Sequence, residues 1–210
     1  MPKSLQRNAQ KYRFFSVYSK FSSIPSKNNA LSPKIREFIY IAIDASTTHL
    51  YLPGLKLHME NALALGATRD EIMEVLELTS VLGIHTCTLG VPILIEELRE
   101  LGRGDEIDDI EYGEYEKRLK ENFKKNRGYW SPFWNDMLKL SPEFFECYLD
   151  FSSVPWVSGT LEPKVKEFIY IAIDTATTHL HKEGARIHIR NALKHGASKE
   201  EIMEIFQCVS

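Results

Sequence analysis

The chain has 210 residues, 43% of them hydrophobic and 26% charged, which is enough to bury a sizeable core as one domain or as two small ones. A formal net charge of -3 gives no electrostatic basis for binding nucleic acid or an anionic membrane surface. The chain shows no evident apolar run of the roughly 18 residues that span a bilayer, so we expect a soluble protein with no membrane partner. Its three cysteines lie far apart, without metal or redox spacing, which predicts reduced thiols and a cytoplasmic location.

One sequence pattern occurs twice, at an offset of 130 residues. The segment LSPKIREFIYIAIDASTTHL, from Leu31, aligns without a gap on LEPKVKEFIYIAIDTATTHL, from Leu161, and HMENALALGATRDEIMEV aligns on HIRNALKHGASKEEIMEI. The register continues upstream, where FSSIP aligns on FSSVP. The segment before Arg36 lacks acidic residues, as a transit peptide does, but this register predicts a folded element from about Phe14 onward.

The first helix of each copy is predicted by an aromatic stripe at i, i+1, i+4 and i+7, which we interpret as core-facing. In the second copy Ser141 is its expected N-cap and Pro142 its first residue. The stripes are Phe14, Phe15, Tyr18 and Phe21 in the first copy, and Phe144, Phe145, Tyr148 and Phe151 in the second.

Later elements follow from caps. The second helix should begin at Ser32-Pro33 and run to about His49, and the third should run from about Gly54 to Leu65 and stop at Gly66. The motifs Thr68-x-x-Glu71 and Ser198-x-x-Glu201 predict capping boxes for a fourth helix. No alternating strand pattern is present, so we expect an all-α helical bundle built from two tandem repeats.

We divide the chain into a first repeat at 1–103, a charged helical connector at 104–130 and a second repeat at 131–210. The first repeat ends in a further predicted helix within VLGIHTCTLGVPILIEELRELG. The connector has acidic residues first and basic residues later, which suits a solvent-exposed helix. The second copy stops at Ser210, the partner of Ser80, so it lacks this last helix. Either the natural chain continues, or a neighbouring subunit covers the exposed core.

A polar face recurs on the second helix of each copy. It holds Glu37, Tyr40, Ile41, Asp44 and Thr48 in the first copy, and Glu167, Tyr170, Ile171, Asp174 and Thr178 in the second. His58 and Asn61 share a face of the third helix, as do His188 and Asn191. An antiparallel hairpin would bring Glu37, His49 and His58 towards one another.

These residues also have structural interpretations. Glu37 and His49 are placed to complement a helix dipole, and His58 could be a packing histidine, as we expect for His85. The joint repetition of acid, histidine and histidine favours a functional role. Tyr51 and Leu52 become His181 and Lys182, so we assign these positions no shared chemistry.

The combined pattern resembles the carboxymuconolactone decarboxylase and alkylhydroperoxidase D family. Its elements are Leu-Ser-Pro-Lys-x-x-Glu, an apolar helix, His-x-x-Asn-Ala-Leu-x-x-Gly-Ala-Thr and Glu-Ile-Met-Glu, and they extend over nearly the whole chain. The resemblance implies an all-α bundle that assembles into a homo-oligomer, a trimer or a hexamer-like ring. It also implies that Glu37 and His58 match the family's glutamate and histidine.

Peroxidase-type members carry a Cys-x-x-Cys pair before that histidine, because a thiolate attacks the peroxide and a second thiol resolves the product. The corresponding residues here are His49 and Leu52, and His179 and Lys182, and the interval from Glu37 to His58 is about two residues longer. The sequence therefore disfavours peroxidase activity.

The resemblance then favours decarboxylation of a small carboxylated lactone or similar organic acid, with no cofactor expected. His58 and His188 are the candidate proton donors, Glu37 and Glu167 their orienting acids, and His49 and His179 the groups that bind a carboxylate or an oxyanion. Asp44, Asn61, Asp174 and Asn191 would form a polar, substrate-binding wall.

Two alternatives remain open. Glu37, His49 and His58, with Glu167, His179 and His188, could instead hold a divalent metal, since two histidines and a carboxylate are a common ligand set. In the other alternative the histidines are structural and the chain is a non-catalytic helical oligomer.

Overall fold

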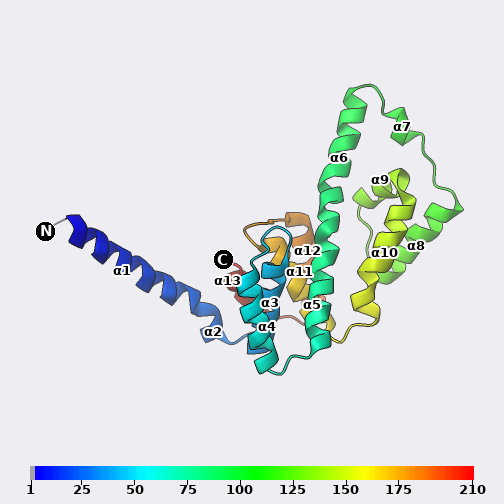
Figure 1. Cartoon of the computed structure of the whole chain (residues 1–210). Coiled ribbons are helices and arrows are strands. Elements are labelled where there is room, and N and C mark those ends of the chain that lie inside the picture. The colour runs from blue at the N-terminus through cyan, green and yellow to red at the C-terminus, as the bar shows by residue number, and fades with distance from the viewer. Residues whose placement is uncertain (1–2) are drawn as a thin grey trace. The chain divides into compact units, whose positions relative to one another are not determined.

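The computed structural model describes residues 3–210 (Figure 1). Side chains are described from Tyr12 onward. The described residues form helices and contain no strand, which confirms the all-α prediction. The helices are α1 (Lys3–Ser22), α2 (Ile24–Asn28), α3 (Pro33–Ala45), α4 (Leu52–Ala64), α5 (Arg69–Val81), the short 3-10 helix η1 (Leu82–Ile84), α6 (His85–Glu100), α7 (Asp105–Asp108), α8 (Glu114–Arg127), α9 (Phe133–Leu140), α10 (Pro142–Val157), α11 (Pro163–Thr175), α12 (Lys182–Lys194) and α13 (Lys199–Cys208).

Two compact units divide the chain differently from the sequence repeats. One, the hairpin unit, consists of residues 1–79 and 160–210, and the other, the inserted unit, consists of residues 80–159. The hairpin unit therefore takes helices from both copies. The inserted unit contains the end of the first copy, the connector and the first helix of the second copy.

The hairpin unit is built on two helical hairpins. Helices α3 and α4 form the first hairpin and α11 and α12 form the second, while α3 packs against α11 and α13 packs against both. Ile39, Phe168 and Ile171 are fully buried in the shared core. The hydroxyls of the equivalent residues Thr48 and Thr178 lie 3.4 Å apart. The two copies therefore meet around a local two-fold axis.

Each copy supplies a buried glutamate to the other. Glu204 on α13 accepts hydrogen bonds from the backbone N–H groups of Ala30 and Leu31, at 2.7 and 3.3 Å, and pairs with Arg36 at 2.8 Å. These contacts satisfy orphan donors ahead of α3 and neutralise a buried carboxylate.

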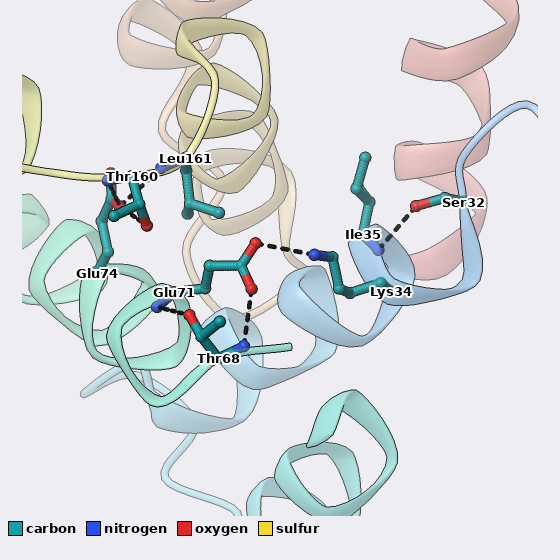
Figure 2. A network of polar contacts seen from close by, with 8 residues as sticks. All are labelled: Ser32, Lys34, Ile35, Thr68, Glu71, Glu74, Thr160 and Leu161. Carbon is teal, nitrogen blue, oxygen red and sulfur yellow. Dashed lines mark hydrogen bonds and ion pairs between the residues drawn. The ribbon is translucent and has the colours of Figure 1, made fainter. Parts of the chain in front are cut away.

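The equivalent glutamate repeats this arrangement in the opposite direction. Glu74 on α5 accepts from the backbone N–H groups of Thr160 and Leu161 ahead of α11 (Figure 2). It also pairs with Lys166 at 2.9 Å. Because Glu74 and Glu204 lie 130 residues apart, the exchange is symmetric between the copies.

The predicted caps are largely confirmed. Glu71 and Thr68 bond reciprocally, with Glu71 also reaching Lys34 (Figure 2), and Ser198 and Glu201 repeat the capping box. Gly66 has a φ of 84°, as a left-handed helix terminator requires. Pro142 opens α10 as expected, but Ser141 makes no side-chain cap hydrogen bond.

The prediction that the second helix reaches His49 is wrong, because α3 ends at Ala45. The carbonyl of Asp44 accepts from the backbone N–H of Tyr51 at 2.9 Å, so the chain turns back instead of continuing the helix. Leu50 lies in the left-handed region with a φ of 48°, and its counterpart Leu180 has a φ of 51°. His49 is thus held in a tight turn that both copies share.

The aromatic stripe of the first copy is not a core stripe. Phe14, Phe15, Tyr18 and Phe21 on α1 are each more than half exposed. The stripe of the second copy is only partly a core stripe, because Phe144 is 50% and Phe151 49% exposed. Phe145 is fully buried there, because Phe123 of α8 and Trp134 of α9 pack against it. In the 130-residue register α9 corresponds to residues 3–10, which form the start of α1 instead of a separate helix packed against the stripe.

The connector differs from the single solvated helix that the charges predict. It forms the short α7 and the longer α8, and α8 buries Leu119 and Phe123 in the core of the inserted unit. Its acidic first turn and basic last turn agree with the expected dipole pattern. The connector is therefore part of a packed unit.

The prediction that no apolar run reaches membrane-spanning length is wrong. Residues 78–95 contain no Asp, Glu, Lys or Arg. Arg69–Glu100 form a helical run of 32 residues whose best 18-residue window has a mean hydropathy of 1.7 and is 28% buried. By length and composition this run could cross a membrane, although core helices of soluble proteins pass the same test.

Replacing Glu204 with Gln should lower the free energy of unfolding by about 3–5 kcal/mol, because Arg36 would stay buried without a counter-charge. Urea titration followed by circular dichroism measures this change. The control is Glu60→Gln, which breaks a 3.9 Å pair with Lys56 on an exposed helix face and should cost less than about 0.5 kcal/mol. Equal effects of the two substitutions would contradict the proposed role of the exchanged glutamate.

Candidate functional site

Each hairpin holds a glutamate and a histidine in direct contact. Nδ1 of His58 on α4 lies 2.7 Å from Oε2 of Glu37 on α3, and Nδ1 of His188 on α12 lies 2.6 Å from Oε2 of Glu167 on α11. An ionised carboxylate accepts the Nδ1–H, so this bond fixes the tautomer and leaves Nε2 for other work.

An asparagine supports each glutamate. The Nδ2 group of Asn61 donates to Glu37 at 3.4 Å, and that of Asn191 donates to Glu167 at 3.1 Å. Both asparagines lie one turn beyond the histidine on the same helix, as the sequence predicts. Their contacts are to the glutamate, which makes them positioning groups for the acid.

An aspartate lies on the opposite side of each imidazole ring. Nε2 of His58 is 4.0 Å from Asp44, and Nε2 of His188 is 4.0 Å from Asp174. His49 and His179 approach the same aspartates, with Nε2 to Oδ1 distances of 3.6 and 3.9 Å. The prediction that Glu37, His49 and His58 approach one another is therefore modified. His58 contacts Glu37 directly, whereas His49 contacts Asp44, which lies beside His58.

A tyrosine covers the ring of each histidine. The ring centroids of Tyr40 and His58 are 4.6 Å apart, and those of Tyr170 and His188 are 4.5 Å apart. Burial, and then a hydrogen bond with Cys208, raise the pKa of Tyr40 well above its usual value. Tyr40 therefore stays a neutral phenol that fixes the orientation of the imidazole. The sequence pattern predicts the helix face of both tyrosines correctly but does not predict their contact with the histidine rings.

Sequence reasoning missed a glycine in each hairpin that makes room for the aspartate. A Cβ at Gly54 would overlap the carboxylate of Asp44 and the ring of Tyr51. A Cβ at Gly184 would overlap the carboxylate of Asp174 and the ring of His181. Both glycines occupy the same position of the repeat, and this shared position is the sequence signal that indicates a structural requirement for glycine.

The electrostatics of the two aspartates follow from burial. Burial raises the pKa of Asp44, against the nearby charges of His58 and His49. Burial raises the pKa of Asp174 to about 7, with His188 opposing and Glu167 assisting. Asp174 can therefore carry a proton near neutral pH. Burial also lowers the pKa of His179.

The two hairpins differ at their turns. His181 accepts a hydrogen bond from the backbone N–H of Gly184 at 3.1 Å, so it caps α12, and its Nδ1 also lies 4.0 Å from Asp174. Tyr51 occupies this position in the first copy and makes no side-chain cap. Lys182, which the sequence analysis gave no role, lines an open cleft of about 510 Å³ together with Asp174.

The free energy of unfolding should depend on the pH through Asp174. Its folded pKa of about 7 lies above the ordinary 3.8, so the folded protein keeps a proton that the unfolded chain releases between about pH 4 and 7. Stability should fall as the pH rises through this interval, with a limiting slope of about 1.4 kcal/mol per pH unit, and should level off above it.

The Asp174→Asn variant should lack this decline in stability with pH. The difference between the pH profiles of the two proteins therefore gives the contribution of the aspartate. The lowered pKa values of His179 and His181 act in the opposite direction and largely cancel in that comparison. Urea titrations at several pH values measure the effect. Parallel pH profiles for the two proteins would contradict it.

Gly184→Ala should destabilise the protein by about 1–3 kcal/mol, because the new methyl group and the Asp174 carboxylate require the same space. Gly90→Ala in α6 adds a methyl group to open space within a helix, so it should stabilise by up to about 1 kcal/mol. Urea titration compares the two. A neutral Gly184→Ala variant would show that this close approach is not required.

Comparisons with known proteins agree with the repeat. The sequence profile described as "Carboxymuconolactone decarboxylase family" matches residues 13–83 and 142–208. A crystal structure of a candidate gamma-carboxymuconolactone decarboxylase subunit from Burkholderia xenovorans LB400 is similar, with a TM-score of 0.88 and 46% sequence identity over 100% of this chain and 84% of that chain. A search of curated proteins gives no significant match. The profile accounts for more than half of the residues and includes both hairpins, so the chain belongs to the carboxymuconolactone decarboxylase family.

Proposed function

We propose that the protein is a lyase that removes CO2 from a small carboxylated lactone or a similar organic acid by acid–base chemistry. The observation that carries this proposal is the duplicated pair of Glu37 with His58 and Glu167 with His188, at 2.7 and 2.6 Å. Membership of the family, and likeness to a candidate gamma-carboxymuconolactone decarboxylase subunit, support the same reaction class.

The histidine is the proposed proton donor. When the bond between the substrate and its carboxylate carbon breaks, CO2 leaves. The electron pair of that bond stays on the substrate, which becomes a dienolate. A proton from Nε2 of His188 or His58 then adds to carbon, and solvent returns a proton to the imidazole. Histidine is suited to this because its charge changes near neutral pH. No net oxidation occurs.

The neighbouring groups prepare this transfer. Glu167 holds Nδ1 of His188 and stabilises the charged ring, while Tyr170 packs on its face. Asp174 lies 4.0 Å beyond Nε2, where it can hold a proton or favour the imidazolium. His179, which lies 3.9 Å from this aspartate, is the proposed partner of a substrate carboxylate or oxyanion. Glu37, Tyr40, Asp44 and His49 repeat these roles in the first hairpin.

Thiol peroxidase chemistry is not proposed. The chain has no Cys-x-x-Cys pair, and histidine stands at the first cysteine position of each copy. Its three cysteines are free thiols at widely separated positions.

A divalent metal is the second candidate, and the geometry changes its ligand set. Glu37 bonds Nδ1 of His58, so it would act as an outer partner that orients a ligand. His58 through Nε2, Asp44 and His49 would then be the candidate ligands, a two-histidine, one-carboxylate set. Asp174, His179 and His188 repeat it.

The decisive experiment measures CO2 release from 4-carboxymuconolactone. The double variant His58→Gln/His188→Gln should lose about 10²–10⁴-fold in kcat, which is the usual contribution of a positioned general acid. His195→Gln, which changes an exposed histidine at the end of α12, is the matched control and should leave the rate unchanged.

Two results would overturn the acid–base proposal. One is a double variant as active as His195→Gln while both remain folded by circular dichroism. The other is near-stoichiometric zinc, iron or manganese in the wild-type protein that disappears in Asp44→Asn/Asp174→Asn, because a resident metal would recast both hairpins as metal centres. Elemental mass spectrometry on the same preparations gives this second answer.

A further inference from the structure

The two hairpins share their Glu–His pairs but present different surfaces beside them. Helix α12 carries four Lys or Arg and one Glu, whereas α4 carries one Lys and one Glu. Because the helices are equivalent by the 130-residue repeat, this difference is a divergence between two otherwise matched sites. It gives the second hairpin an electropositive outer face that the first hairpin lacks.

Part of this face lines a cleft. Lys182, Ala185, Arg186 and Ile189 lie at i, i+3, i+4 and i+7, which is one face of α12. They line the open cleft of about 510 Å³ together with Asp174 and Thr175 from the end of α11 and Leu180 from the turn. This volume lies in the range of small-molecule sites.

The composition of the cleft suits an organic carboxylate. Leu180, Ala185 and Ile189 offer an apolar wall, and Lys182 and Arg186 offer two cationic donors one helical turn apart. Glu183 is the nearest acidic neighbour of Arg186, at 4.0 Å, and both side chains are more than half exposed, so this pair is weak. Arg186 therefore keeps donors for a ligand.

The equivalent face of the first hairpin lacks these features. Lys182 is replaced by Leu52 and Ala185 by the larger Leu55, while Lys56 stands for Arg186. Lys56 has Glu60 on the next turn, at 3.9 Å, whereas the residue equivalent to Glu60 is Arg190. At these positions the first hairpin thus has two cations fewer, one acid more and a bulkier apolar residue where the second cleft opens.

The catalytic groups lie next to the cleft. Asp174 belongs to its lining and is 4.0 Å from Nε2 of His188. A ligand whose carboxylate pairs with Lys182 and Arg186 would rest its body on the apolar wall and approach this aspartate and histidine.

We propose that the second hairpin is the main carboxylate-binding site of this protein, with Lys182 and Arg186 as its anion-binding residues, and that the first hairpin binds the same ligand much more weakly. The site takes a small organic acid with an apolar body. The reaction at this site rests on the function proposed above, whereas the binding does not.

Binding of 5-oxotetrahydrofuran-3-carboxylate, a saturated lactone carboxylate, tests this proposal without requiring turnover. Its Kd is measured by NMR titration of the histidine ring signals, with the neutral 4-butyrolactone as the reference ligand. Lys182→Leu and Arg186→Leu should each weaken binding of the carboxylate at least about tenfold and leave the weak binding of the neutral lactone unchanged.

Matched variants use the repeat. Lys56→Leu removes the cation equivalent to Arg186 from the first hairpin and should change the Kd by less than twofold. Ala185→Leu copies Leu55 of the first hairpin into the cleft and should abolish binding without a change of charge. Circular dichroism confirms that each variant is folded.

The proposal falls if the wild-type protein does not bind the carboxylate, if the Lys182 and Arg186 variants bind it as wild type does, or if Lys56→Leu is equally damaging. The decarboxylase proposal fails separately. Binding that depends on Lys182 without any CO2 release would keep this site and remove the reaction. CO2 release that is insensitive to Lys182, Ala185 and Arg186 would keep the reaction and remove this site.

Discussion

The arrangement of the hairpin unit depends on two buried carboxylates, each of which serves the opposite copy. Glu204 and Glu74 satisfy backbone N–H groups ahead of α3 and α11, which no intrahelical bond can satisfy. Arg36 and Lys166 neutralise them, because a buried charge without a partner would be prohibitively unfavourable. This exchange places the two central helices against each other. It therefore helps to set how the two Glu–His pairs are arranged relative to each other.

Within each hairpin, polar contacts also fix the positions of the site residues. The helix that ends at Ala45 returns its chain through a turn bonded to the Asp44 carbonyl, and Gly54 lets the aspartate carboxylate approach α4. The imidazole of His58 is then held by Glu37 at one nitrogen, by Tyr40 on its face, and near Asp44 at the other nitrogen. One side chain is thereby given a fixed tautomer and a directed Nε2, as proton transfer requires.

Duplication gives the protein two versions of this arrangement, and their differences are informative. The second version buries its aspartate almost completely, at 1% exposure against 8% for Asp44, which is why the pKa of Asp174 rises to about 7. Its turn is capped by His181, and its outer helix face is cationic. Positions that differ between the copies, such as Leu52 and Lys182, are not found by comparing repeated residues. They are the residues on which the proposed division of labour depends.

The sequence by itself determined the helical class, the repeat, the caps at Thr68 and Ser198, and the pairing of Glu37 with His58, because these follow from helical periodicity and from residues at fixed short spacing. Tertiary structure decided the rest. The end of α3 at Ala45 depends on a turn that reaches Tyr51, and the burial of Phe145, in contrast to the exposure of its counterpart Phe15, depends on the packing of α8 and α9. The exchange of Glu74 and Glu204 joins residues more than 80 positions apart. Local sequence patterns do not reveal such partners. The pairing of a buried donor with a particular carboxylate is decided only when the two copies pack together.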